Sequence, residues 1–128
     1  MSMAKYQIQV CTTFNASHQL RLSNGQWEPV HSHDWRVQLT IGAEQLDDIE
    51  TVMDFHELEA LLAEAVRPLT GQVINQAPPF SEGINPSAER VAEHIAAKLS
   101  SGLPAHVSLI HVQVMEAPEC WAIYTRSI

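Results

Sequence analysis

The chain has 128 residues, which suits one domain spanning residues 1–128, and 45% of them are hydrophobic, enough for a packed core. Seven basic residues against fifteen acidic ones give a formal net charge of −8, which argues against nucleic acids and anionic membranes as partners because both attract basic surfaces. No apolar run approaches the ~20 residues of a membrane-spanning helix.

The N-terminus and the cysteines bear on the cellular compartment. Residues 1–5 lack the apolar centre of a secretory signal peptide, so we expect a cytoplasmic protein. Cys11 and Cys120 do not have the spacing of a metal-binding or redox pair. Both lie in strand-like runs, where we expect them to be small buried residues.

Alternation of polar and apolar residues predicts two strands early in the chain, over residues 5–14 and 34–42. A polar loop joins them, and residues 23–25 (Ser-Asn-Gly) mark its turn because Asn and Gly tolerate positive φ. Two further strands are predicted near the C-terminus, over residues 107–115 and 121–124.

A first helix is predicted in the middle of the chain. Apolar residues recur at three- and four-residue steps from Phe55 to Ala65, and Pro68 ends the pattern. Asp54 is placed to cap the N-terminus of this helix, with Glu57 three positions further on as in a capping box.

A second helix is predicted to begin near residues 85–89. Asn85 is the candidate cap, and Pro86 can occupy the first turn. Residues 101–102 (Ser-Gly) end the helix.

The resulting order is strand, strand, helix, helix, strand, strand. It predicts an α+β protein with a four-stranded antiparallel sheet and both helices on one face. Such a sheet leaves two edges unpaired. Pairing of these edges between subunits into a closed barrel would satisfy them, so we expect a homo-oligomer.

Three histidines form a candidate metal site. His31 and His33 are two residues apart, so on a strand their side chains leave the same face, close enough for one metal ion to bind both. If the first two strands are neighbours, His18 can join them. Three nitrogen ligands with an open fourth position are typical of catalytic zinc. From the spacing alone, two exposed strand histidines remain the alternative.

These pieces together resemble the 6-pyruvoyltetrahydropterin synthase / 6-carboxytetrahydropterin synthase family. The resemblance implies the tunnelling fold, in which three subunits close a β-barrel and two trimers stack as a hexamer. It also implies a zinc ion held by His18, His31 and His33. The matching stretches span most of the chain and are Phe14-Asn15-Ala16-Ser17-His18, His31-Ser32-His33, Met53-Asp54-Phe55, Asn85-Pro86-Ser87-Ala88-Glu89 and Glu116.

The resemblance further implies a pterin site between subunits and 7,8-dihydroneopterin triphosphate as substrate. Glu116 and Ser87 would bind this substrate. A carboxylate can accept two parallel hydrogen bonds from the N–H edge of a 2-amino-4-oxopyrimidine, which suits Glu116 to the task. Without the resemblance, Glu116 reads as a surface carboxylate at the end of a strand.

The chain departs from the family in its catalytic residues. The usual catalytic cysteine lies four residues before the first histidine of the pair, where this chain has Trp27. Thr70 and Gly71 stand where the family has the Asp and His of its proton relay. One branch of the family uses a glutamate in place of the cysteine and releases 6-hydroxymethyl-7,8-dihydropterin. Glu28 is therefore the candidate general base, and a solvated loop glutamate is the alternative.

We therefore expect a zinc-dependent lyase that acts on the side chain of 7,8-dihydroneopterin triphosphate and yields a 6-pyruvoyl-, 6-carboxy- or 6-hydroxymethyl-pterin. One alternative is a catalytically silent homo-oligomer that binds zinc and a pterin. Another is a related enzyme of the same fold that acts on another pterin or on a substrate without a triphosphate. His56 and His111 are remote candidates for the missing proton carrier.

Overall fold

Four strands and two α-helices make up the architecture. The structure is a computed structural model that describes residues 4–126, so the first three residues of the N-terminal segment considered above lie outside it. The strands form one antiparallel sheet in the order β1-β2-β3-β4, which confirms the predicted α+β class. The elements in chain order are β1 (Tyr6–His18), β2 (His31–Ala43), α1 (Phe55–Val66), α2 (Ala88–Leu99), β3 (Ser108–Ala117) and β4 (Cys120–Thr125).

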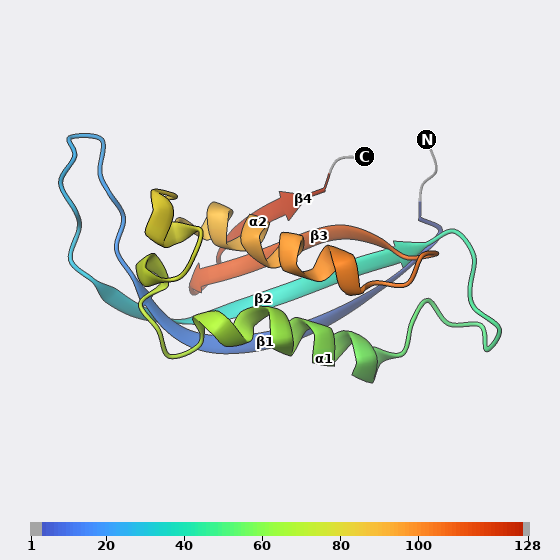
Figure 1. Ribbon diagram of the computed structural model, residues 1–128. Coiled ribbons are helices and arrows are strands. Elements are labelled where there is room, and N and C mark those ends of the chain that lie inside the picture. The colour runs from blue at the N-terminus through green and yellow to red at the C-terminus, as the bar shows by residue number, and fades with distance from the viewer. Residues whose placement is uncertain (1–3, 127–128) are drawn as a thin grey trace.

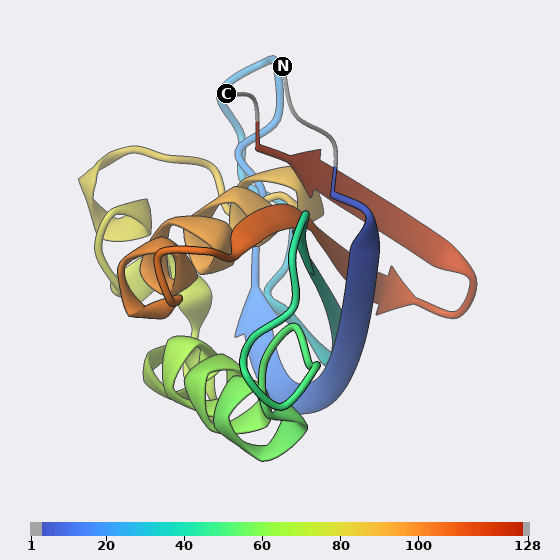
Figure 2. The same ribbon diagram turned by 90° about the vertical axis from the view of Figure 1, so that its right-hand side faces the viewer.

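Both helices lie against the same face of the sheet, as Figures 1 and 2 show. α1 packs on β1, and α2 packs on β3 and β4. Alternate residues of β2 point toward the helices and are fully buried there, namely Trp35, Val37, Leu39 and Ile41. Leu58 and Leu62 of α1 and Val91 and Ile95 of α2 meet them from the other layer. Within the described residues, no helix combines the length and hydropathy that crossing a membrane requires.

β1 is longer than the predicted strand, which ended at residue 14. Its pairing with β2 continues through Ala16 opposite His33 to His18 opposite His31. The alternation also continues, because Phe14, Ala16 and His18 are all buried on the helix side. The loop between the two strands, residues 19–30, projects past this end of the sheet (Figure 1).

The outer edge of β1 is covered by the protein's own chain near this end. The Gly71 N–H donates to the carbonyl of Asn15 at 2.7 Å, and the Ser17 N–H donates to the carbonyl of Gln72 at 2.9 Å. The segment after α1 thus supplies main-chain partners that an edge strand otherwise lacks.

The helix caps are partly as predicted. Asp54 caps α1, and its carboxylate accepts a hydrogen bond from the Glu57 N–H at 3.2 Å. The prediction for α2 is wrong, because Ser87 is the cap and accepts from the Arg90 N–H at 3.2 Å. Asn85 lies two residues before the cap, and its side chain forms hydrogen bonds with the main chain of Arg21.

The expectation for the cysteines is wrong, since Cys11 and Cys120 are both exposed. Cys11 lies opposite Gln38, whose neighbours on β2 point to the core. Strand alternation therefore turns Cys11 to the face that the helices leave uncovered.

Two adjacent leucines of α1 test this packing. Leu62 is fully buried, so Leu62→Ala is expected to lower the free energy of unfolding by about 2–5 kcal/mol. Leu61 is partly exposed, so Leu61→Ala should cost clearly less. Chemical denaturation of both variants measures the difference, and equal losses would contradict the burial pattern of α1.

Candidate metal centre

The structure brings the three predicted histidine rings together. His18 ends β1 directly opposite His31, the first residue of β2, and His33 follows two residues later on the same face. The ring centroids are 4.7 Å apart for His18 and His31, 5.2 Å for His18 and His33, and 4.7 Å for His31 and His33. The rings therefore continue the core-facing rows of both strands beyond the end of the apolar core.

Glu116 completes the cluster. It lies on β3 where the pairing with β4 shifts between Met115 and Ala117, and such irregularities redirect side chains. One carboxylate oxygen, Oε1, is 2.7 Å from Nε2 of His18 and 3.9 Å from Nε2 of His33. One ligand atom from each of the four residues lies within 4.8 Å of the others, so the group could hold a metal ion.

Two main-chain carbonyl groups orient the rings. Nδ1 of His18 is 2.8 Å from the carbonyl oxygen of Pro86, and Nδ1 of His31 is 2.9 Å from that of Pro29. A carbonyl oxygen only accepts, so each Nδ1 carries a hydrogen, and in the neutral imidazole each Nε2 then presents a lone pair. Metal-binding histidines are commonly held in this way.

The lone pairs inside the cluster lack partners. Nε2 of His18 and Nε2 of His33 are buried and form no hydrogen bond within the described residues. Oε1 of Glu116 approaches His18 Nε2 closely, but without hydrogen-bond geometry. Lone pairs that face one another out of water are unfavourable unless a cation lies between them. The residues present therefore fit a metal ion.

The floor of the cluster is apolar. Trp35 is fully buried, and its ring meets His18 edge-on at 4.9 Å and His33 at 5.7 Å. Burial lowers the pKa of His33, although the nearby Glu116 carboxylate acts in the opposite direction. A lowered pKa favours the neutral imidazole, which is the form that binds metal.

Glu28 lies beside the cluster. Its Oε1 accepts a hydrogen bond from the Leu20 N–H at 3.0 Å and is 3.8 Å from Nε2 of His31. Its neighbour Trp27 lies apart from the cluster, half exposed, with the Arg21 guanidinium 6.0 Å from its ring centroid. The loop thus directs the Glu28 carboxylate, and not the Trp27 ring, toward the histidines.

Three other residues singled out in the sequence have local structural partners. The Ser87 hydroxyl caps α2. The Thr70 hydroxyl donates to the carbonyl of Val66 at 3.0 Å. Gly71 contributes its N–H to the edge of β1.

The two remote histidines are not brought to the cluster. His56 is exposed on α1, with Nδ1 3.3 Å from Glu59. His111 lies opposite Thr40 on β3, and alternation turns it to the face of the sheet away from the helices.

Sequence reasoning missed several residues that support the cluster. Trp35 could have been found, because it follows His33 by two residues and so shares its face. The carbonyl groups of Pro29 and Pro86 could not, because their positions depend on how two loops fold.

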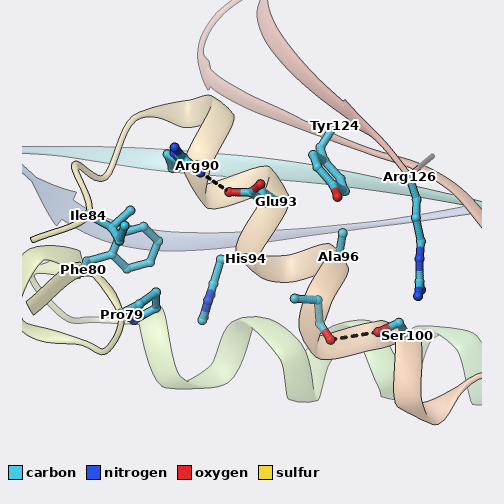
Figure 3. A pocket seen from close by; sticks show the side chains of 11 residues that line it. Pro79, Phe80, Ile84, Arg90, Glu93, His94, Ala96, Ser100, Tyr124 and Arg126 are labelled. Atoms are coloured by element: carbon cyan, nitrogen blue, oxygen red, sulfur yellow. Dashed lines mark hydrogen bonds and ion pairs between the residues drawn. The ribbon is translucent and has the colours of Figure 1, made fainter. Parts of the chain in front are cut away.

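A separate hollow of about 530 Å³ lies between α2 and β4, and no residue of the cluster lines it (Figure 3). The ring of His94 there packs edge-on against Phe80 at 5.2 Å, and Arg90 pairs with Glu93 at 2.7 Å. Burial lowers the pKa of His94. The cluster, in contrast, opens to solvent on the side of His31 and Glu116, whose side chains are 40% and 31% exposed.

Metal analysis tests the cluster. The purified protein is expected to contain about one divalent metal ion per chain. His31→Ala removes one nitrogen ligand from an exposed position and should weaken binding by on the order of 100-fold or more in competition with a chromophoric chelator. His56→Ala is the matched control and should bind as the unaltered chain does. Stoichiometric tight binding by His31→Ala would contradict the assignment.

Comparisons with known proteins agree with this architecture. A family model described as 6-pyruvoyl tetrahydropterin synthase matches residues 7–127. No curated protein matches the chain.

Several solved structures are similar. Caenorhabditis elegans 6-pyruvoyl tetrahydropterin synthase has a TM-score of 0.78 and 18% identity, covering 95% of this chain and 96% of that chain. The Plasmodium falciparum enzyme has a TM-score of 0.75 and 18% identity, covering 98% and 100%. A Plasmodium vivax variant, in which a catalytic glutamate is replaced by alanine, has a TM-score of 0.78 and 16% identity, covering 96% and 98%. At these identities the shared feature is the fold, which is the tunnelling fold that the resemblance implied.

Proposed function

This chain belongs to the 6-pyruvoyl tetrahydropterin synthase family, and from that premise we propose that it is a zinc-dependent lyase acting on the side chain of 7,8-dihydroneopterin triphosphate. The product would be a 6-pyruvoyl-, 6-carboxy- or 6-hydroxymethyl-pterin. The observation that supports the proposal most strongly is the convergence of three histidines with a carboxylate at the end of the core face, beside a second carboxylate.

The donor set supports zinc as the metal. Three imidazole nitrogens on His18, His31 and His33 form the kind of site in which catalytic zinc keeps a position for water or substrate. When bound, the ion would polarise an oxygen of the substrate's side chain and so acidify the adjacent C–H group.

Glu28 is the proposed general base. Its hydrogen bond to Leu20 uses Oε1, so Oε2 can take up a proton from the substrate. Its side chain is 26% exposed, and the partial burial limits the motion of the carboxylate. The catalytic glutamate of the similar Plasmodium vivax protein supports a carboxylate in this role.

Glu116 and Ser87 are the proposed substrate-binding residues. Because Oε1 of Glu116 faces His18, the carboxylate must turn outward or use its other oxygen to accept the pterin N–H groups. Ser87 accepts a hydrogen bond from Arg90, so its own O–H can still donate to a bound molecule.

The open edges of the sheet support a homo-oligomer. β4 and the first part of β1 each expose main-chain groups that another copy can pair with. We place three subunits in a closed barrel and two such trimers in a hexamer, with the pterin site between subunits and the protein in the cytoplasm.

The second candidate function is a silent zinc- and pterin-binding oligomer. It is favoured by the replacement of the usual catalytic residues with Trp27, Thr70 and Gly71, none of which can carry a proton near neutral pH.

Incubation of the zinc-loaded protein with 7,8-dihydroneopterin triphosphate, followed by mass spectrometry of the products, tests the first proposal. Glu28→Gln removes the base while keeping a similar shape, so turnover should fall by about 10²–10⁴-fold with the metal retained.

Glu59→Gln, an exposed change on α1, is the matched control and should leave turnover unaltered. Unimpaired Glu28→Gln would remove Glu28 from the mechanism. Tight pterin binding without any product from the unaltered protein would instead favour the silent binder.

Sedimentation tests the assembly. We expect a trimer-based particle, because strand pairing between copies satisfies the two open edges. A clean monomer at micromolar concentration would contradict the closed barrel.

A further inference from the structure

The three residues after His18 are held by two asparagines from distant parts of the chain. The Gln19 N–H donates to Oδ1 of Asn75 at 3.0 Å, and Nδ2 of Asn75 donates to the Gln19 carbonyl at 2.8 Å. The Arg21 N–H donates to Oδ1 of Asn85 at 2.8 Å, and Nδ2 of Asn85 donates to the Arg21 carbonyl at 3.1 Å. Each amide thus gives and accepts one hydrogen bond, as a neighbouring strand residue would.

Glu28 binds the opposite side of the same backbone. In an extended segment the main-chain groups of successive residues point to alternate sides, so Leu20 faces away from the two asparagines. The Leu20 N–H donates to Oε1 of Glu28 at 3.0 Å, and the Leu20 carbonyl accepts from the Glu28 N–H at 3.0 Å. Residues 19–21 therefore form a strip with the asparagines on one side and the proposed base on the other.

The strip is also tied to the metal cluster. It continues directly from His18, whose ring is oriented by the carbonyl of Pro86. Pro86 follows Asn85 in the chain, and the Ser87 N–H donates to the Asn85 carbonyl at 2.9 Å. One short segment before α2 thus fixes both a histidine ring of the cluster and the main chain that holds Glu28.

The strip would have room to shift without these amides. A hollow of about 310 Å³ borders it, lined in part by Gln19, Arg21, Asn75 and Asn85. Beyond the strip, the tip of the loop is exposed, and Leu22 at its base is 44% exposed. Within the strip, Gln19 and Leu20 are only partly buried and Arg21 is exposed, so packing of side chains alone does not fix it.

We propose that Asn75 and Asn85 are positioning residues that hold residues 19–21 and thereby fix the carboxylate of Glu28 beside the histidine cluster. This inference rests on the proposed role of Glu28 as base. Neither asparagine needs to touch the substrate. Their effect passes through two hydrogen bonds between Leu20 and Glu28.

A double-mutant cycle tests the inference through kinetics. Asn75→Ala and Asn85→Ala are each expected to lower kcat by on the order of 10-fold with little change in KM, because the base is misplaced. In the Glu28→Gln background the same changes should cause no further loss, because there is no base left to position. Equal losses in both backgrounds would overturn the inference. Asn24→Ala, at the tip of the same loop, is the matched control and should leave kcat unchanged.

Amide hydrogen exchange gives a readout that does not depend on turnover. The Leu20 N–H is bonded to Glu28 and to neither asparagine, so it reports how the strip is held. Its exchange should accelerate at least several-fold in Asn75→Ala and Asn85→Ala but not in Asn24→Ala. Unchanged exchange at Leu20 would overturn the inference even if the protein proved to be a silent binder. Asn75→Asp keeps an acceptor for the Gln19 N–H but sets a carboxylate oxygen against the Gln19 carbonyl, so exchange at Leu20 should also accelerate, and this variant serves if an alanine variant does not fold.

Discussion

The cross-strand pairing of His18 with His31 is the contact on which the rest of the site depends. It follows from the same two-residue alternation that buries Phe14 opposite Trp35. Core packing therefore fixes the register between β1 and β2, and this register determines where the histidine rings lie. A shift of one residue between β1 and β2 would turn one strand's histidines to the opposite face and expose its apolar row at the same time. The strand register of the site is therefore protected by the free energy of core packing.

The cluster also lowers the stability of the folded protein when no cation is bound. Two buried nitrogen lone pairs without hydrogen-bond partners lie next to a carboxylate, and each such group destabilises a folded protein when water is excluded. The Pro86 carbonyl holds the ring of His18 so that its Nε2 cannot turn away from the carboxylate. A bound cation would convert this cost into stabilisation, so the arrangement that weakens the metal-free fold is also the one that could hold a metal ion.

Sequence patterns predicted what depends on local periodicity and missed what depends on contacts between distant segments. The spacing of His31 and His33 is a property of any strand, so their shared face could be predicted, and the same holds for the cap at Asp54. The apolar character of Cys11 does not predict its exposure; Cys11 follows the buried Val10, so strand alternation turns it to the uncovered face. The redirected side chain of Glu116 depends on a shift in pairing with β4, and Asn85 acts on a segment 64 residues away. No local pattern encodes either one.

Hydrogen bonds within the chain along the outer edge of β1 limit where a second copy of the chain can pair with this strand. From Asn15 onward, that edge is occupied by main chain and amides of the same molecule. Any intermolecular ladder on β1 must therefore stop within residues 6–14, a length comparable to the short strand β4 at the other edge. The histidines lie at the end of β1 beyond residues 6–14, where this chain itself occupies the outer edge, and so outside any such ladder.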